Sequence, residues 1–500
     1  MLFKNTLAQS GSMLLGYLLS FLLAPIMISR LGLDTFGVWA VTGAVATYAG
    51  LLDLGIGRSL ARFVAVFDAE GDDEKIRQCV GLGLLAVTAV GAAASLGAAL
   101  AAPFLSDSLG VLSTADMRAV VVAAVAIWTL NGYQDVLNVV GLGKRRMVPP
   151  NVADAISVSV NFAFSITALM LSTSLVVYAV ANAAAALVAV VPAFFAMRHL
   201  WASPYAAVPD RALIREVVAF SVKNQVGWIA DLVNFQTDKV IIALVVDIRA
   251  AAVYEIASRV VMAVRSAAIL TVSAIIPTAA ARIVEEGREV IGEMYRRYLL
   301  RSCAIAFPLF MLASLTAPFL LVAWLGDAPG DSELLVPFLT LAYMANITTG
   351  AGSTIAIAAG HPGMVSLNSI LIAALNVAFT LALAPFFGVW GVVGGTFLAL
   401  LVGSLRFSER FLSRFGLPAR DFAAGAAPTA LLAVGLALPF ALPAVLIGDP
   451  AGRLPAAALL GLTALGYGLV YWLAASRLDY LPEQLRFPRL RRAASTGAAP

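Results

Sequence analysis

Charged residues are scarce in this chain of 500 residues, and their scarcity defines its class. Asp, Glu, Lys and Arg together make up 12% of the sequence, whereas hydrophobic residues make up 61%. Soluble domains carry roughly 25% charged and about 45–50% apolar residues. This composition therefore excludes an ordinary soluble globular protein and predicts a polytopic membrane protein.

Cysteine and histidine are nearly absent as well, with two residues of each kind. Cys79 and Cys303 fall at expected cytoplasmic helix ends, where thiols stay reduced, and His199 and His361 are isolated from each other. The sequence therefore predicts no disulfide framework, no metal site and no cofactor. It also lacks the G-x-S-x-G, phosphate-loop and H-E-x-x-H motifs, so we expect neither an enzyme nor a chain that hydrolyses ATP.

Apolar runs recur along the whole chain, and each is long enough to cross a hydrocarbon core of about 30 Å. A spanning segment must satisfy its own backbone hydrogen bonds, so we expect all of these runs to be α-helices. We predict fourteen spans, at residues 7–29, 36–57, 79–105, 117–142, 149–171, 174–197, 217–243, 250–280, 299–325, 335–359, 364–386, 388–408, 423–446 and 455–475.

Positive charge is distributed unevenly over the predicted loops. If the N-terminus is cytoplasmic, 25 of the 33 Lys and Arg residues lie in cytoplasmic loops and termini, and four lie on the outer side. Because Lys and Arg concentrate in cytoplasmic loops, both termini are predicted to be cytoplasmic. The basic residues are dispersed over separate loops, so the net charge of +4 indicates membrane topology rather than nucleic-acid binding.

Weak similarity between the two halves of the chain indicates a repeat of six helices. The second and eighth spans begin alike, and an amphipathic, charged loop follows each of them. Such repeats are typical of many secondary transporters. We therefore predict two pseudo-symmetric six-helix bundles, at 1–200 and 215–412, followed by two additional transmembrane helices at 420–476 and a basic cytoplasmic tail at 477–500.

Two apolar segments that follow the first predicted bundle carry most of the charge inside the membrane. A charged group at bilayer depth costs at least about 2.5–3.5 kcal/mol, so it faces a partner, a cavity or a pathway. The spacing of Lys223, Asp231, Asn234 and Asp238 places them on one helical face, which predicts a water-filled cavity. The alternative is that these charges pair with one another, for instance Asp231 with Arg259, to hold the helices together.

The candidate site residues comprise substrate-binding candidates and acids that could couple transport or line the cavity. Glu255 and Arg259 are four residues apart and can pair along one helix. In the first bundle, Asp53 lies near the inner end of the second span, and Asp135 lies in the fourth span. The candidates for substrate binding are Lys223, Asp231, Asn234, Arg259 and Arg265, and the possible coupling or cavity acids are Asp53, Asp135, Asp238 and Glu255.

Four stretches of the chain resemble the Wzx-type polysaccharide flippases, which translocate O-antigen and exopolysaccharide precursors. LGLDTFGVWA at 31–40 and GLLDLG at 50–55 look like the first part of that family. TDKVII at 237–242 and AVYEIASR at 252–259 look like its seventh and eighth helices. The family belongs to the multidrug/oligosaccharidyl-lipid/polysaccharide exporter superfamily, so the resemblance implies two six-helix bundles around a central cavity.

The resemblance also implies a substrate, which is an undecaprenyl-diphosphate-linked oligosaccharide flipped across the bacterial cytoplasmic membrane. Its diphosphate needs fixed cations in a cavity of low dielectric, and Lys223, Arg259 and Arg265 are the candidates. Asp231 and Asp238 would hold these cations or bind a coupling ion, and Asn234 would contact sugar hydroxyls. Membrane lipids, a polysaccharide polymerase and glycosyltransferases are the expected partners, with no nucleic acid.

Three alternatives stay open. The chain resembles a lipid II flippase of the same superfamily in its helix count, although its first bundle has no Lys or Arg well inside a helix. A multidrug or cation antiporter would use an acidic, aromatic cavity rather than a cationic one. A non-transporting membrane scaffold of a polysaccharide-synthesis complex would use the polar face purely for helix pairing.

Overall fold

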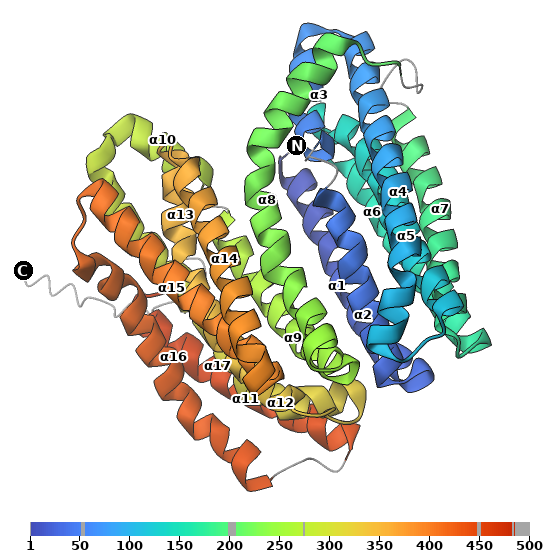
Figure 1. Ribbon diagram of the computed structural model, residues 1–500. Coiled ribbons are helices and arrows are strands. Elements are labelled where there is room, and N and C mark those ends of the chain that lie inside the picture. Colours follow the sequence, from blue (N-terminus) through green and yellow to red (C-terminus); the bar gives the residue numbers. More distant parts are fainter. Residues whose placement is uncertain are drawn as a thin grey trace, which may run out of the picture. The chain divides into compact units, whose positions relative to one another are not determined.

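The computed structural model of the chain consists of helices joined by short connections (Figure 1). The structure describes residues 2–51, 56–198, 207–273, 276–447, 452–482 and 485, and within these ranges it contains no strand. Eleven of the described helices are long and apolar enough to cross a membrane. The expected all-α, multi-pass class is therefore confirmed, whereas fourteen spans and cytoplasmic termini remain predictions.

The chain forms two compact units, and the first comprises Met1–Arg259, Pro329–Ser332 and Ser366–Ala399. Within it, α5 packs against α4 and α7, α6 packs against α1 and α7, and α8 packs against α2 and α3. Its helices are α1 (Leu2–Leu31), α2 (Leu33–Thr47), the short η1 (Tyr48–Leu51), α3 (Ile56–Glu70), α4 (Asp73–Leu109), α5 (Thr114–Gly143), α6 (Val148–Leu171), α7 (Leu175–Arg198) and α8 (Arg211–Val245), with the start of α9 (Ile248–Ser273), most of α14 (Pro362–Phe387) and the start of α15 (Val389–Phe415).

The second unit comprises Val260–Ala328, Glu333–Val365 and Leu400–Pro500. In this unit α11 packs against α13, α16 and α17, and α10 packs against α13. Besides the remaining parts of α9 and α15, its helices are α10 (Ile276–Glu286), the short η2 (Arg288–Val290), α11 (Ile291–Leu325), α12 (Ser332–Ile347), α13 (Thr349–Ala358), α16 (Ala419–Ile447) and α17 (Arg453–Arg477). The predicted four-part division stays a prediction, and most of the 477–500 tail lies outside the described residues.

Local sequence signals explain where several of these helices begin and end. The side chain of Asp72 accepts a hydrogen bond from the backbone N–H of Lys75 and caps α4, and Asp210 caps α8 in the same way through Leu213. An N-cap side chain satisfies one of the backbone N–H groups that a helix leaves without a partner. At the other end of α4, Gly110 takes the left-handed conformation that favours glycine after a helix.

The predicted spans at 36–57 and 335–359 are each interrupted in the structure. The span expected at 36–57 is divided, because α2 ends at Thr47, η1 follows it, and α3 begins at Ile56. The span expected at 335–359 is divided at Thr348, between α12 and α13. Glycine weakens helix interiors, and Gly50 lies at the first of these breaks, within η1. Hydrophobic length alone did not predict the breaks.

Candidate functional site

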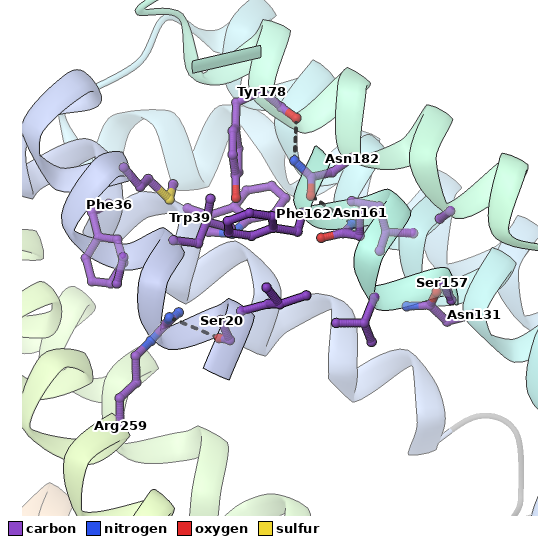
Figure 2. A pocket seen from close by; sticks show the side chains of 17 residues that line it. Ser20, Phe36, Trp39, Asn131, Ser157, Asn161, Phe162, Tyr178, Asn182 and Arg259 are labelled. Atoms are coloured by element: carbon purple, nitrogen blue, oxygen red, sulfur yellow. Dashed lines mark hydrogen bonds between the residues drawn. The ribbon is translucent and has the colours of Figure 1, made fainter. Parts of the chain in front are cut away.

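A cavity of about 350 Å³ lies in the first unit, between side chains of α1, α2, α5, α6, α7 and α9. Figure 2 shows the side chains that line it. Aromatic rings come from Phe36, Trp39, Phe162 and Tyr178, and the polar side chains are Ser20, Asn131, Ser157, Asn161, Asn182 and Arg259. Within the part of the chain that the structure describes, Arg259 is therefore the one charged residue that lines this cavity.

Arg259 reaches the cavity from α9, and three contacts hold its guanidinium. Its Nε donates to Glu255 Oε1 over 2.9 Å, and its Nη1 lies 3.5 Å from the Oγ of Ser20 on α1 (Figure 2). The guanidinium carbon lies 5.3 Å from the ring centre of Phe36. The Arg259 side chain stays 27% exposed, so its charge is held in place and remains accessible from the cavity.

A close approach of backbones brings α2 to the beginning of α9. A Cβ atom on Gly37 would lie 2.6 Å from the carbonyl oxygen of Ile248, which is closer than such atoms pack. Glycine at this position therefore lets the two helices meet, since it has no side chain. The neighbouring Phe36 is thereby positioned for its contact with Arg259.

Glu255 lies between two cations. Its Oε2 accepts from the Nζ of Lys239 on α8 over 2.6 Å, while its Oε1 accepts from Arg259. The Glu255 side chain is 10% exposed and the Lys239 side chain 12% exposed. Buried charges are tolerated when they are paired and hydrogen-bonded, and here one carboxylate serves two cations. The group consequently keeps a net positive charge, and Arg259 carries it at the cavity.

Amide side chains form the wall on α6 and α7. Asn161 donates to Asn182 Oδ1 over 2.9 Å, and Ser165 donates to the same oxygen over 3.0 Å. The amino group of Asn182 donates to the carbonyl oxygen of Tyr178 (Figure 2). Tyr178 in turn meets Trp39 edge to face, with 5.2 Å between the ring centres. These contacts fix the orientation of the amides, so the wall presents polar groups in set positions.

A second polar cluster surrounds Asp238 on α8. Asp238 Oδ2 accepts from the hydroxyls of Tyr254 and Thr396, each over 2.8 Å, and Asn376 donates to the Thr396 hydroxyl over 3.1 Å. Asp238 is 2% exposed, and among the described residues its Oδ1, the Oδ1 of Asn376 and the Oγ1 of Thr380 have no hydrogen-bond partner. A buried carboxylate among oxygens that lack partners is costly. Binding of a proton or a small cation would neutralise its charge.

The remaining predicted site residues are distributed as follows. Asn234 is buried on α8, and Arg265 lies in the second unit, with its guanidinium 5.6 Å from the ring centre of Tyr343. Asp135 is exposed on α5 and lines a different cavity of the first unit. Lys223 and Asp231 belong to α8, but their side chains lie outside the described part of the structure, as does Asp53 altogether. The expected pairing of Glu255 with Arg259 is confirmed.

Sequence reasoning missed several residues of the site. Lys239 was not among the predicted site residues, and its partner Glu255 lies on another helix. Tyr178 and Asn182 were not singled out, although Asn182 is the one amide in the apolar run LVVYAVANAAAALVAVV that starts α7. A polar side chain inside a membrane-spanning run needs a hydrogen-bond partner. The isolated amide of Asn182 could therefore have been recognised from the sequence.

The arrangement of helices is that of known membrane transporters. A structure described as the lipid II flippase MurJ in an inward closed conformation aligns with a TM-score of 0.72 at 12% identity, covering 95% of this chain and 100% of the other. A multidrug resistance MATE family transporter of the MOP superfamily, inward-facing, aligns with a TM-score of 0.66 at 16% identity over 80% and 94%. A MOP superfamily transporter from Pyrococcus furiosus aligns with a TM-score of 0.53 at 19% identity over 83% and 97%.

These similarities define the class, a multi-pass membrane protein with the MOP-superfamily transporter fold. Residues 2–283 match the model of the family described as "Polysaccharide biosynthesis protein", and the chain therefore belongs to that family. The resemblance seen in the sequence is thus confirmed. The similar structures are described as a flippase and a transporter, which is the class of protein that the sequence predicted in place of an enzyme. No curated protein sequence matches the chain.

Proposed function

We propose that this protein is a flippase that moves an undecaprenyl-diphosphate-linked oligosaccharide across the bacterial cytoplasmic membrane for polysaccharide export. One observation carries the proposal, which is the accessible guanidinium of Arg259 in a cavity whose other lining side chains are uncharged and include amides, hydroxyls and aromatic rings. The family description and the MOP-superfamily fold support it. Movement would follow alternating access, in which helix bundles rock around the bound substrate.

The chemistry of a lipid diphosphate matches this cavity. Phosphate oxygens that leave water lose their hydration, so the protein must supply charge and hydrogen-bond donors in its place. A guanidinium presents a planar fork of N–H donors that suits phosphate oxygens. Arg259 supplies that fork, and the amides of Asn161 and Asn182 line the same cavity. A lipophilic cation would instead be repelled, which disfavours a multidrug cation antiporter.

We further propose that Asp238 is the coupling group of the cycle. Its carboxylate is enclosed by Tyr254, Thr396 and Asn376, so a change in its charge alters the hydrogen bonds among α8, α9, α14 and α15. The conservative variant Asp238→Asn keeps the shape of the side chain and removes the charge. It is expected to bind the lipid-linked oligosaccharide while flipping becomes independent of an imposed ion gradient.

Reconstituted liposomes test the proposal directly. Lipid-linked oligosaccharide extracted from cells that make the protein is incorporated, and a membrane-impermeant lectin reports its arrival in the outer leaflet. Arg259→Gln is expected to weaken substrate binding by about tenfold to a hundredfold, the value of a charge-assisted hydrogen-bond pair, and to slow flipping. Arg249→Gln is the matched control, because Arg249 is exposed near the beginning of the same helix.

Three outcomes would contradict the proposal. Flipping that is unchanged by Arg259→Gln would separate the cavity from transport. If the purified protein flips nothing in liposomes while cells that make it still export the polysaccharide, a scaffold for polymerase and glycosyltransferase partners would be favoured. Transport of lipid II in preference to the extracted oligosaccharide lipid would favour the lipid II flippase.

A further inference from the structure

A second cavity, of about 460 Å³, lies in the first unit and shares only Asn131 with the lining of the first cavity. Its volume falls within the range of about 300–1,000 Å³ that small-molecule sites occupy. Its aromatic and polar lining residues are Trp128, Asn131, Asp135 and Asn138 on α5, Asn151 and Asp154 on α6, and Gln225 on α8. The cavity therefore offers an aromatic ring together with amide and carboxylate groups.

The polar groups of this second cavity are held in place by one network. Asp154 Oδ1 accepts from Gln134 Nε2 over 2.7 Å and from Asn138 Nδ2 over 2.8 Å. Gln134 Oε1 accepts from the hydroxyl of Ser157 over 2.9 Å. Because both amino groups point at one carboxylate oxygen, the rotamers of the two amides are fixed. A site built from fixed groups is pre-organised for a ligand.

The network leaves one acceptor unsatisfied. Asn138 is 5% exposed, and its Oδ1 has no hydrogen-bond donor among the described residues. Nearly all buried polar atoms in proteins have a partner, and a buried carbonyl oxygen is costly until a donor reaches it. The second cavity therefore calls for a ligand that brings hydrogen-bond donors to Asn138.

The chemistry of the wall narrows the class of ligand. One oxygen of the Asp154 carboxylate accepts from two neutral amides, and Asp135 lines the same cavity, so the two acids would repel a carboxylate or phosphate brought close to them. Hydroxyl groups donate readily to carboxylate and amide oxygens. The indole of Trp128 supplies an apolar surface against which the C–H face of a ring can pack. An uncharged, hydroxyl-rich ring, that is a neutral sugar residue, meets all three conditions.

We infer that this second cavity is a subsite for neutral sugar residues of the transported glycan, an inference that rests on the proposed function. Asn131 lines both cavities, and Ser157 lines the first while it bonds to the network of the second. The two cavities are therefore neighbours, and α5 and α6 contribute to the walls of both. Arg259 serves the diphosphate of the substrate, and the Asn138–Asp154 network serves its sugars.

Binding of two probes to the purified full-length protein in lipid nanodiscs tests this inference. One probe is bare undecaprenyl diphosphate, and the other is the oligosaccharide-bearing lipid extracted from cells that make the protein. The wild type is expected to bind the glycosylated lipid about tenfold more tightly than the bare lipid, as one or two net hydrogen bonds would give. Asn138→Leu and Trp128→Leu are expected to abolish that difference and to leave the affinity for the bare lipid unchanged.

The bare lipid also serves as the test of folding for each variant. Ser159→Ala is the matched control, because Ser159 is exposed on α6 and its hydroxyl bonds to its own helix. The inference is overturned if either variant keeps the full preference for the glycosylated lipid, or if both variants lose both lipids. Failure of the proposed function would give a different result: Arg259→Gln would leave the affinity for bare undecaprenyl diphosphate unchanged.

Discussion

Glu255 sets the charge that the first cavity presents. Its carboxylate accepts from Arg259 on the same helix and from Lys239 on α8, so the positive charge of the pair of cations is only half neutralised. If Lys239 were absent, Glu255 would neutralise Arg259 completely. Lys239 does not line the cavity, and it therefore acts through Glu255 as a positioning residue.

Lys239→Met is expected to lower the affinity for undecaprenyl diphosphate by about tenfold, because the remaining Glu255–Arg259 pair is neutral overall. The double variant Lys239→Met with Glu255→Gln is expected to restore it, since Arg259 then keeps an uncompensated charge. Titration of undecaprenyl diphosphate against the three proteins measures both effects. A purely structural role for Lys239 predicts no rescue, and melting temperatures in detergent identify variants that fail to fold.

The sequence predicted part of this charge cluster and could not predict the rest. The pairing of Glu255 with Arg259 follows from helical spacing, because residues four apart share a face. The contact of Lys239 with Glu255 joins two helices, and nothing in one sequence fixes which faces of α8 and α9 meet. Arg265 shows the same limit, since its charge alone did not reveal that it lies beside Tyr343 in the second unit.

At the scale of helices, α14 and α15 approach each other closely near the Asp238 cluster. A Cβ atom on Gly395 would lie 2.7 Å from the backbone nitrogen of Thr380, whereas a Cβ atom on the adjacent Gly394 would meet nothing within 4 Å. Thr396, the next residue, accepts from Asn376 and donates to Asp238. The geometry of the cluster therefore depends on a glycine at position 395.

Gly395→Ala is expected to destabilise the protein by about 1–3 kcal/mol, the usual cost of overpacking, and so to lower its melting temperature. Gly394→Ala is the matched control, and it is expected to be neutral or stabilising by up to about 1 kcal/mol, because alanine favours a helix interior. Thermal unfolding of both variants in the same detergent measures the difference. Equal melting temperatures would show that α14 and α15 can separate at this point without loss.

Helix existence was easier to predict from the sequence than helix continuity. Apolar length predicted a helix in each expected span of the described chain, since a spanning segment must satisfy its own hydrogen bonds. It did not predict that α2 ends at Thr47 or that α12 and α13 separate at Thr348. Such breaks depend on how neighbouring helices pack and where they leave room for a turn, which hydropathy does not record.

For the whole molecule, the distribution of loop charge predicts an orientation that the fold alone leaves open. Helix α4 has 37 residues, about 55 Å of helix, so it is longer than a hydrocarbon core of about 30 Å and its two ends belong to opposite sides. The positive-inside rule assigns the loop before α4 to the cytoplasm and the loop after α4 to the outer side. Glu70 and Asp107 are exposed near these two ends.

Cysteine labelling in intact cells tests this orientation, because the native Cys79 and Cys303 are both buried and stay silent. A membrane-impermeant maleimide is expected to label Asp107→Cys in intact cells, and to label Glu70→Cys only after the membrane is permeabilised. The unsubstituted protein, treated with the maleimide under both conditions, gives the background signal. Labelling of Glu70→Cys from outside would invert the chain and place most of its Lys and Arg loops outside the cell. The proposed substrate would enter from the cytoplasmic leaflet, so an inverted chain would also reverse the direction of the proposed transport.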